Sequence, residues 1–177
     1  EVQVIAQDWK WLFIYPEQGI AVVNELVFPS GRPLSLKITS DTVMNSFFIP
    51  ALSGQIYAMA GMRTELNLLA DEPGRFRGRN MQYSGDGFSN QNFMAIATTG
   101  EDFETWVDKV RAAPQGLDAE TYQALAKPSE KHPVTYYATV APKLFDSVVL
   151  KFAGCVGSES GEATQFAGLE ASLCLAN

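Results

Sequence analysis

Histidine and cysteine are scarce in this chain of 177 residues, which contains one His and two Cys. A single His leaves most catalytic schemes that use a histidine acid or base without their central residue. The sequence also lacks the G-x-S-x-G, H-E-x-x-H and P-loop patterns that position nucleophiles, metals or phosphates. We therefore expect no independent catalytic activity from this chain.

The few His and Cys residues that do occur are poorly placed for chemistry. Cys155 and Cys174 lie in the last part of the chain, and neither belongs to a C-x-x-C pair or has a neighbouring His. Two Cys do not make a disulfide framework, so we interpret them as structural or incidental, either paired or free. His132 stands in a polar loop without a partner, which makes it a poor candidate for metal binding or catalysis.

Basic residues are also few, with 13 Lys and Arg against 20 Asp and Glu, and the net charge is −7. This balance argues against nucleic acid and anionic membrane surfaces as partners, because both attract basic patches. No run of 18 or more apolar residues occurs, so we expect no membrane-spanning helix, and the opening residues lack a signal-peptide pattern. The hydrophobic share of 46% is enough for the core of one domain with an extension.

Residues 1–100 consist of short β-prone segments separated by turn signals rich in Pro, Gly, Asp and Ser. The chain opens on a β-branched stretch that leads into the aromatic run 9–15. Further strands are expected over 20–28, 34–39, 46–49, 55–59, 63–70, 75–83 and 92–98. Many short strands at near-regular spacing indicate a mainly β protein, built as a sandwich or a barrel.

The residues that follow have helical periodicity instead. Four apolar residues fall at positions i, i+3, i+4 and i+7 of a helix expected over 102–112, namely Phe103, Trp106, Val107 and Val110. A second helix is expected from an N-cap at Asp118 through residue 126. A short extended piece is expected over 135–139. A third helix is expected over 143–152, with an apolar stripe made by Leu144, Val148 and Phe152.

These patterns divide the chain into three regions. A β domain covers 1–100 and a helical extension covers 101–153. The remaining residues, 154–177, are rich in Gly, Ser and Glu, a composition that suits a flexible tail.

One segment, QYSGDGFSNQNFM over 82–94, carries a resemblance to a known family. Its positions 83, 87, 91 and 94 have the spacing of the copper loop of cytochrome oxidase subunit II, which reads Cys-x3-Cys-x3-His-x2-Met. The four places are occupied here by Tyr83, Gly87, Gln91 and Met94, so only the Met is retained. The segment resembles a copper loop from which the ligands have been lost.

Two further segments resemble the same family and occur in the same order along residues 1–100. VMNSFFIP, over 43–50, is similar to the family's V-L-H-S-W-x-x-P, with Asn45 at the place of a copper-binding His. WKWLFIY, over 9–15, is similar to the aromatic run that opens the domain. The resemblance implies a cupredoxin-like Greek-key β-sandwich or barrel, followed by a short helical extension of the quinol-oxidase type.

The residue types at these positions do not suit copper. A dinuclear copper centre needs bridging thiolates and imidazoles, and a lone thioether is a weak ligand. We therefore expect no metal and no other cofactor in this chain. Met94, which follows Phe93 in an apolar strand, is interpreted as a core residue.

The aromatic run supplies two candidates for contact with a partner. In copper-bearing relatives the first Trp of this run lies where electrons enter from cytochrome c, and Trp9 matches that place. Without copper there is no acceptor for such an electron. Trp9 and Trp11 are therefore expected to be packing or docking aromatics.

The resemblance implies that this chain is the non-catalytic, structural subunit II domain of a haem–copper quinol oxidase of the cytochrome bo type. Such complexes oxidise quinol, reduce oxygen to water and pump protons as part of the aerobic respiratory chain. The implied partners are the large subunit I, which holds the haems and a copper ion, and the other oxidase subunits. The family carries a membrane hairpin before this domain, which implies a longer subunit in the bacterial inner membrane with this domain on the periplasmic side.

Two alternatives stay open. The chain could be a free, metal-less cupredoxin-like binding module of the periplasm, although such a module has no obvious use for a helical extension. A copper electron carrier is disfavoured by the ligand count, and copper uptake would revive it.

Overall fold

The computed structural model describes residues 1–153, which form eleven strands, three α-helices and one 3-10 turn. The strands are β1 Val2–Gln7, β2 Lys10–Tyr15, β3 Ile20–Val23, β4 Glu25–Pro29, β5 Leu34–Ser40, β6 Asn45–Phe48, β7 Ile56–Ala58, β8 Thr64–Leu68, β9 Gly74–Asn80, β10 Asn92–Thr98 and β11 Thr135–Tyr137. The helices are α1 Gly100–Arg111, α2 Ala119–Ala126 and α3 Leu144–Phe152, and the 3-10 turn is η1 Phe88–Asn90.

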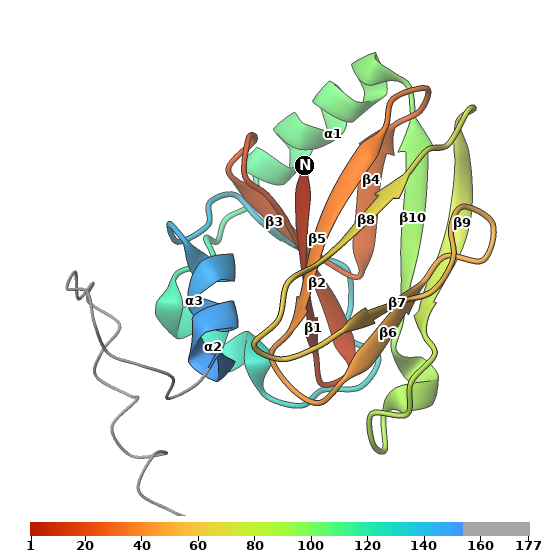
Figure 1. Ribbon diagram of the computed structural model, residues 1–177. Helices are drawn as coiled ribbons and strands as arrows, with labels where there is room; N and C mark the ends of the chain where they lie inside the picture. Colours follow the sequence, from red (N-terminus) through yellow and green to blue (C-terminus); the bar gives the residue numbers. More distant parts are fainter. Residues whose placement is uncertain (154–177) are drawn as a thin grey trace, which may run out of the picture.

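The strands form two sheets that pack face to face, with α2 and α3 on one side and α1 at one end (Figure 1). The six-stranded sheet has the order β11-β3-β2-β1-β5-β8, and the five-stranded sheet has the order β4-β10-β9-β6-β7. The expected β-sandwich and its helical extension are therefore confirmed. Among residues 1–153, no helix has both the length and the apolar character needed to cross a membrane.

One predicted strand is wrong, because the segment 20–28 forms two strands that belong to different sheets. The break is Asn24, which has a left-handed backbone with φ of 60°. Its Oδ1 accepts a hydrogen bond from the Trp11 backbone N–H at 2.9 Å, and its Nδ2 donates to the His132 carbonyl at 2.8 Å. Asn tolerates this conformation better than most residues, so a single side chain directs the chain from one sheet to the other.

The six-stranded sheet is buried on both faces, which explains why β2 reads as an almost continuous apolar run. Alternate residues of β2 face opposite sides, as the pleat of a strand requires. One side faces the five-stranded sheet across an inner core whose aromatic members are Trp11, Phe13, Tyr15, Phe28, Phe47, Phe93 and Phe103. The other side faces α2 and α3 across an outer core that includes Ile5, Leu12, Ile14, Leu125, Phe145 and Val148.

The helices complete both cores. The predicted stripe of α1 is confirmed, since Phe103, Val107 and Val110 are buried in the inner core. The predicted N-cap of α2 is confirmed, because the Asp118 side chain accepts a hydrogen bond from the backbone N–H of Thr121 at 2.8 Å. The stripe of α3 holds for its first two members only, since the side chain of Phe152 is 40% exposed.

A buried carboxylate attaches α2 and α3 to the sheet. The Asp41 side chain, which is 1% exposed, pairs with Lys151 Nζ at 2.8 Å and accepts a hydrogen bond from the Tyr122 hydroxyl at 2.7 Å. Burial and this carboxylate raise the pKa of Tyr122 well above its ordinary value.

Residues 101–153 thus pack on the β part, while the boundary placed at residue 100 stays a prediction. The predicted tail, with Cys155 and Cys174, lies outside the described residues.

Asn24 provides a test of the sheet switch. Asn24→Ala loses two hydrogen bonds and the tolerance of a left-handed backbone, so it should lower the free energy of unfolding by about 2 kcal/mol. Asn24→Gly loses the same hydrogen bonds but adopts the conformation freely, so it should cost about 1 kcal/mol less than Ala. Urea unfolding of the two variants and the wild type measures both values. Equal costs for Ala and Gly would show that the backbone conformation is not what makes Asn necessary.

Candidate functional site

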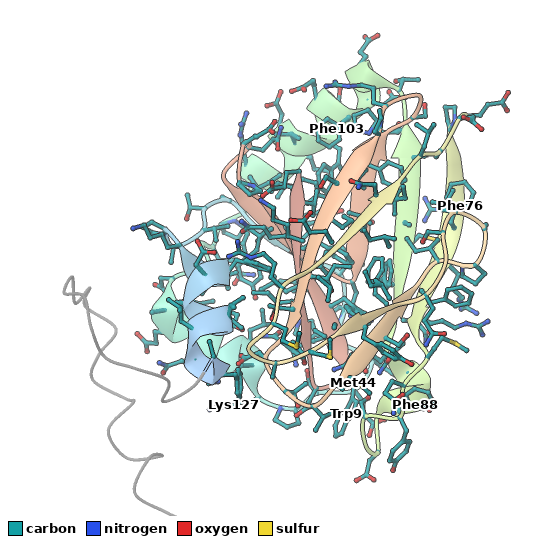
Figure 2. The ribbon with its side chains drawn as sticks, viewed as in Figure 1. Trp9, Met44, Phe76, Phe88, Phe103 and Lys127 are labelled. Carbon is teal, nitrogen blue, oxygen red and sulfur yellow. The ribbon has the colours of Figure 1, made fainter. Side chains whose placement is uncertain are left out.

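The residues singled out by the sequence lie at the end of the sandwich opposite α1. Three segments meet there: the β1–β2 turn at Asp8 and Trp9, the β5–β6 connection 41–44, and the β9–β10 loop 81–91. Figure 2 shows Trp9, Met44 and Phe88 together at this end, far from Phe103 of α1. We call this region the loop end.

Three buried side-chain amides meet at the loop end and form an amide cluster of Asn45, Asn80 and Gln91. Asn80 Nδ2 donates to Asn45 Oδ1 at 2.8 Å and to Gln91 Oε1 at 2.9 Å. Gln91 Nε2 donates to Asn45 Oδ1 at 2.9 Å, which closes a triangle. Each of the three residues is less than 5% exposed. The cluster therefore satisfies the hydrogen-bonding groups of its members away from bulk water.

Further hydrogen bonds tie the amide cluster to the surrounding chain. Asn80 Oδ1 accepts from the backbone N–H groups of Ser46 at 2.8 Å and Gln82 at 3.0 Å. Asn45 Nδ2 donates to the Val43 carbonyl at 2.8 Å, and the Ser84 hydroxyl donates to Gln91 Oε1 at 2.9 Å. The cluster thus joins β6, the end of β9 and the β9–β10 loop into one unit.

Sequence reasoning missed Asn80, the central member of the cluster. Its signal was the alternation of β9, whose residues Gly74, Phe76, Gly78 and Asn80 point to the same side. Because Phe76 packs against the inner core and Gly78 is buried, a polar residue next in that series predicts a buried hydrogen-bonding partner.

The structure brings together only two of the predicted ligand positions. Asn45 and Gln91 are in direct contact within the amide cluster. Tyr83 points outward, with 70% of its side chain exposed, and stacks at an angle on Phe88 with ring centroids 5.7 Å apart. Gly87 is buried against Trp9 instead of facing the cluster.

Trp9 closes the loop end by packing on glycines. A Cβ atom added at Gly87 would lie 2.3 Å from the indole ring, and one at Gly85 would lie 3.2 Å from it. The indole Nε1 donates to the Ser84 carbonyl at 2.9 Å. The indole therefore takes the space that any side chain at Gly87 would need, and it fixes the loop backbone by a hydrogen bond.

The structure decides the roles of Trp11 and Met94, and the core interpretation of Met94 is wrong. Trp11 is fully buried, with its ring edge-to-face against Phe47 at 5.3 Å, so of its two expected roles it has packing and not docking. Met94 is half-buried and belongs to neither core, because β10 turns Phe93 inward and Met94 outward, opposite Arg77 of β9. The alternation of β10 decides the position of Met94.

A buried lysine anchors the 127–132 segment beside the loop end. Lys10 Nζ donates to the Asp8 carbonyl, the Lys127 carbonyl and the Ser129 hydroxyl, each at 2.9 Å. Burial lowers the pKa of Lys10 to about 8, and the nearby Asp8 partly opposes this shift. Burial, assisted by the charge of Lys10, also lowers the pKa of His132.

The donor set at the loop end does not fit a dinuclear copper centre. Its side chains are amides and a hydroxyl, whereas copper in such centres is held by thiolates and imidazoles. The polar atoms of the amide cluster also bind one another, so metal binding would have to break those hydrogen bonds. Nowhere in residues 1–153 do three or more His, Cys, Asp or Glu side chains converge on a possible metal position.

Comparison with known proteins gives two family matches. The model for the cytochrome c oxidase subunit II periplasmic domain matches residues 15–100, and the one for the cytochrome oxidase aromatic-rich motif matches residues 111–154. The crystal structure of the periplasmic domain of subunit II of cytochrome oxidase from Bradyrhizobium japonicum superposes with a TM-score of 0.59 at 21% identity. The match covers 61% of this chain and 90% of that one. The expected cupredoxin-like fold is thus confirmed.

Relatives with higher sequence identity are also found. Cytochrome bo(3) ubiquinol oxidase subunit 2 of Pseudomonas putida is 55% identical over 154 residues, which are 87% of this chain and 49% of that protein. Ubiquinol oxidase subunit 2 of Acetobacter aceti is 55% identical over 151 residues, which are 85% of this chain and 49% of that protein. The chain therefore spans about half the length of the curated relatives it matches.

The amide cluster can be tested by removing its centre. Asn80→Ala leaves Asn45, Gln91 and two backbone N–H groups without their buried partner, so it should lower the free energy of unfolding by about 3 kcal/mol or more. The matched control is Asn67→Ala, which removes an exposed side chain of β8 and should change stability by less than about 0.5 kcal/mol. Urea unfolding followed by Trp fluorescence measures both. Similar costs for the two variants would contradict a structural role for the cluster.

The contact between Trp9 and Gly87 can be tested by a double-mutant cycle. Gly87→Ala should lower the free energy of unfolding by about 2 kcal/mol, because the new methyl group overlaps the indole. In a Trp9→Leu background the same change should cost less than about 1 kcal/mol. Gly54→Ala is the control, since a Cβ there meets no atom within 4 Å. An unchanged cost of Gly87→Ala in the Trp9→Leu background would refute the contact.

Proposed function

Because the chain belongs to the family of oxidase subunit II periplasmic domains, we propose that it is the non-catalytic subunit II domain of a haem–copper quinol oxidase. The observation that carries this proposal is the amide cluster, with Asn45 and Gln91 at positions where the copper-bearing family has ligands. The 55% identity to ubiquinol oxidase subunits 2 supports the same assignment.

The chemistry of the two electron donors explains why such a domain has no need of copper. Cytochrome c is soluble and gives up one electron at a time, so its oxidase needs a docking surface and an electron relay outside the membrane. Quinol is apolar and reaches the oxidase within the bilayer, where it can deliver electrons to the haem-bearing subunit directly. An outer relay is then unnecessary, and the domain keeps its fold as a structural part of the complex.

In this proposal the former ligand positions have structural roles or none. Asn45 and Gln91 form the amide cluster, Gly87 makes room for Trp9, and Tyr83 stays on the surface. Met94 is the one ligand type retained, and it points to the outer face of the five-stranded sheet. The haems and copper of the complex belong to the large partner subunit, which oxidises quinol, reduces oxygen to water and pumps protons.

The loop end is the face by which this domain docks on the large subunit. Four exposed apolar side chains gather on its connecting segments: Val43, Met44, Met81 and Tyr83, with exposed fractions of 54%, 39%, 43% and 70%. Grouped exposed apolar residues mark protein interfaces. Half-buried Trp9 lies at the same end of the molecule as Met44 (Figure 2) and extends the same surface.

The domain boundaries and the location complete the proposal. The cupredoxin-like domain of 1–100 and the extension of 101–153 act as one body, because Asp41 binds both α2 and α3. A membrane hairpin in the longer subunit would anchor this body to the bacterial inner membrane, on its periplasmic side.

The proposal is tested on the full-length subunit, tagged and purified gently from membranes together with whatever accompanies it. We expect haem in the preparation, and oxygen consumption with a short-chain ubiquinol but not with reduced cytochrome c. Haem-free material without oxygen uptake would overturn the assignment, as would oxidation of cytochrome c.

The same preparation tests the docking face. Met44→Ser combined with Met81→Ser should reduce the haem that co-purifies with the tagged subunit, because it makes the loop end polar. Met62→Ser combined with Leu69→Ser is the matched control, since both residues are exposed apolar side chains that lie outside the loop end. Equal haem in the two double variants would rule out the loop end as the docking face.

A further inference from the structure

A row of three arginines lies on the outer face of the five-stranded sheet. Arg75, Arg77 and Arg79 alternate along β9, and all three side chains are exposed. We call them the arginine row. Figure 1 shows β9 and β10 on the side of the molecule away from α2 and α3, so neither of these two helices covers this face.

The arginine row places three uncompensated charges side by side on one strand. In residues 1–153 none of the three guanidinium groups forms an ion pair or a side-chain hydrogen bond. Arg63, in contrast, pairs with Asp146, and Arg111 pairs with Asp108. The chain carries 20 acidic residues and a net charge of −7, so unpaired arginines side by side are not a consequence of a general excess of basic residues.

The surface around the arginine row is partly apolar. Strand register places Met94 beside Arg77 and Ile96 beside Arg75 on β10, and Phe48 of β6 beside Arg79. These three neighbours are half-buried. The face therefore combines a line of positive charge with apolar contact area, which is the composition of a protein-binding surface in which Arg supplies the polar contacts.

We propose that the arginine row binds an acidic segment of a partner protein in an extended conformation. Alternate residues of a strand are about 6.6 Å apart, so an extended segment with Glu or Asp at every second position presents carboxylates at the same spacing as the three arginines. Each guanidinium group can bind a carboxylate through two parallel hydrogen bonds. The proposal rests on the described fold and does not depend on the proposed function.

The charge of the whole domain favours a protein segment over a lipid surface. An anionic bilayer is broad and repels a domain with a net charge of −7 as a body. A narrow acidic segment interacts with the arginine row alone, because charges farther away than about 8 Å are screened at physiological salt. A membrane is therefore the competing outcome of the test.

The test measures binding of the full chain to a capped peptide of six Thr-Glu repeats by isothermal titration calorimetry at low salt. Replacing Arg75, Arg77 and Arg79 together by Gln should weaken binding about tenfold, as expected for three exposed ion pairs. The matched control replaces Lys127, Lys131 and Lys143 by Gln, three exposed lysines that form no ion pair within residues 1–153. Both variants change the net charge from −7 to −10, so the comparison is matched in net charge.

Three results would overturn the proposal. Equal weakening in the two triple variants would show that net charge alone governs binding. Equal binding of a peptide with the same composition but six Glu followed by six Thr would exclude the extended, alternating match. Binding of phosphatidylglycerol vesicles that disappears in the arginine variant, without binding of the Thr-Glu peptide, would assign the arginine row to a lipid surface.

Discussion

Buried amide groups must be hydrogen-bonded, and the loop end of this domain is organised by that requirement. Asn80 meets it by donating to Asn45 and Gln91 and by accepting from the backbone of the neighbouring segments. A metal centre in this position would tie the same segments together through coordinate bonds. Here a set of hydrogen bonds does so, and because each bond contributes only about 1 kcal/mol net, the cluster works through its number of bonds and its burial. The position of Trp9 over Gly87 follows from the same arrangement, since the loop backbone must be held where the ring can reach it.

The sheets and the helical extension hold the loop end in a fixed position. The six-stranded sheet is buried on both faces, so β2 lies between two hydrophobic cores and all its residues are buried. The β1–β2 turn, which carries Trp9, therefore projects from rigid elements. Lys10, buried at the start of β2, holds the 127–132 segment against the same turn. The helical extension thus supports the loop end as well as covering the sheet.

Much of the fold could be predicted from the sequence, and each failure concerns a single residue. The β-sandwich, the stripe of α1 and the N-cap at Asp118 follow from periodicity and capping chemistry, which are local properties. The sheet switch at Asn24 escaped prediction because one residue interrupts an otherwise continuous β-prone run, and only its distant partners explain it. Met94 was misplaced because the outward positions of β10, which include Met94 and Ile96, are partly apolar as well. The residue types of that strand therefore do not show which of its faces lies outside. Asn45 and Gln91 were found by spacing, whereas Asn80 lies outside the spaced motif, and its place in the alternation of β9 is the one sign of its burial in the sequence.

The central claim is that amide hydrogen bonds occupy the place of a copper centre, and copper binding by the chain tests it most directly. The measurement uses the chain with Cys155 and Cys174 replaced by Ser, so that thiols outside the described residues cannot take up metal. The chain is incubated with copper under oxidising and reducing conditions, desalted and analysed for bound metal. The account predicts no copper above the level of a control protein, because the amide cluster offers neither thiolate nor imidazole. Copper that is retained in a stoichiometric amount, and is lost when Asn45 and Gln91 are both replaced by Ala, would contradict it.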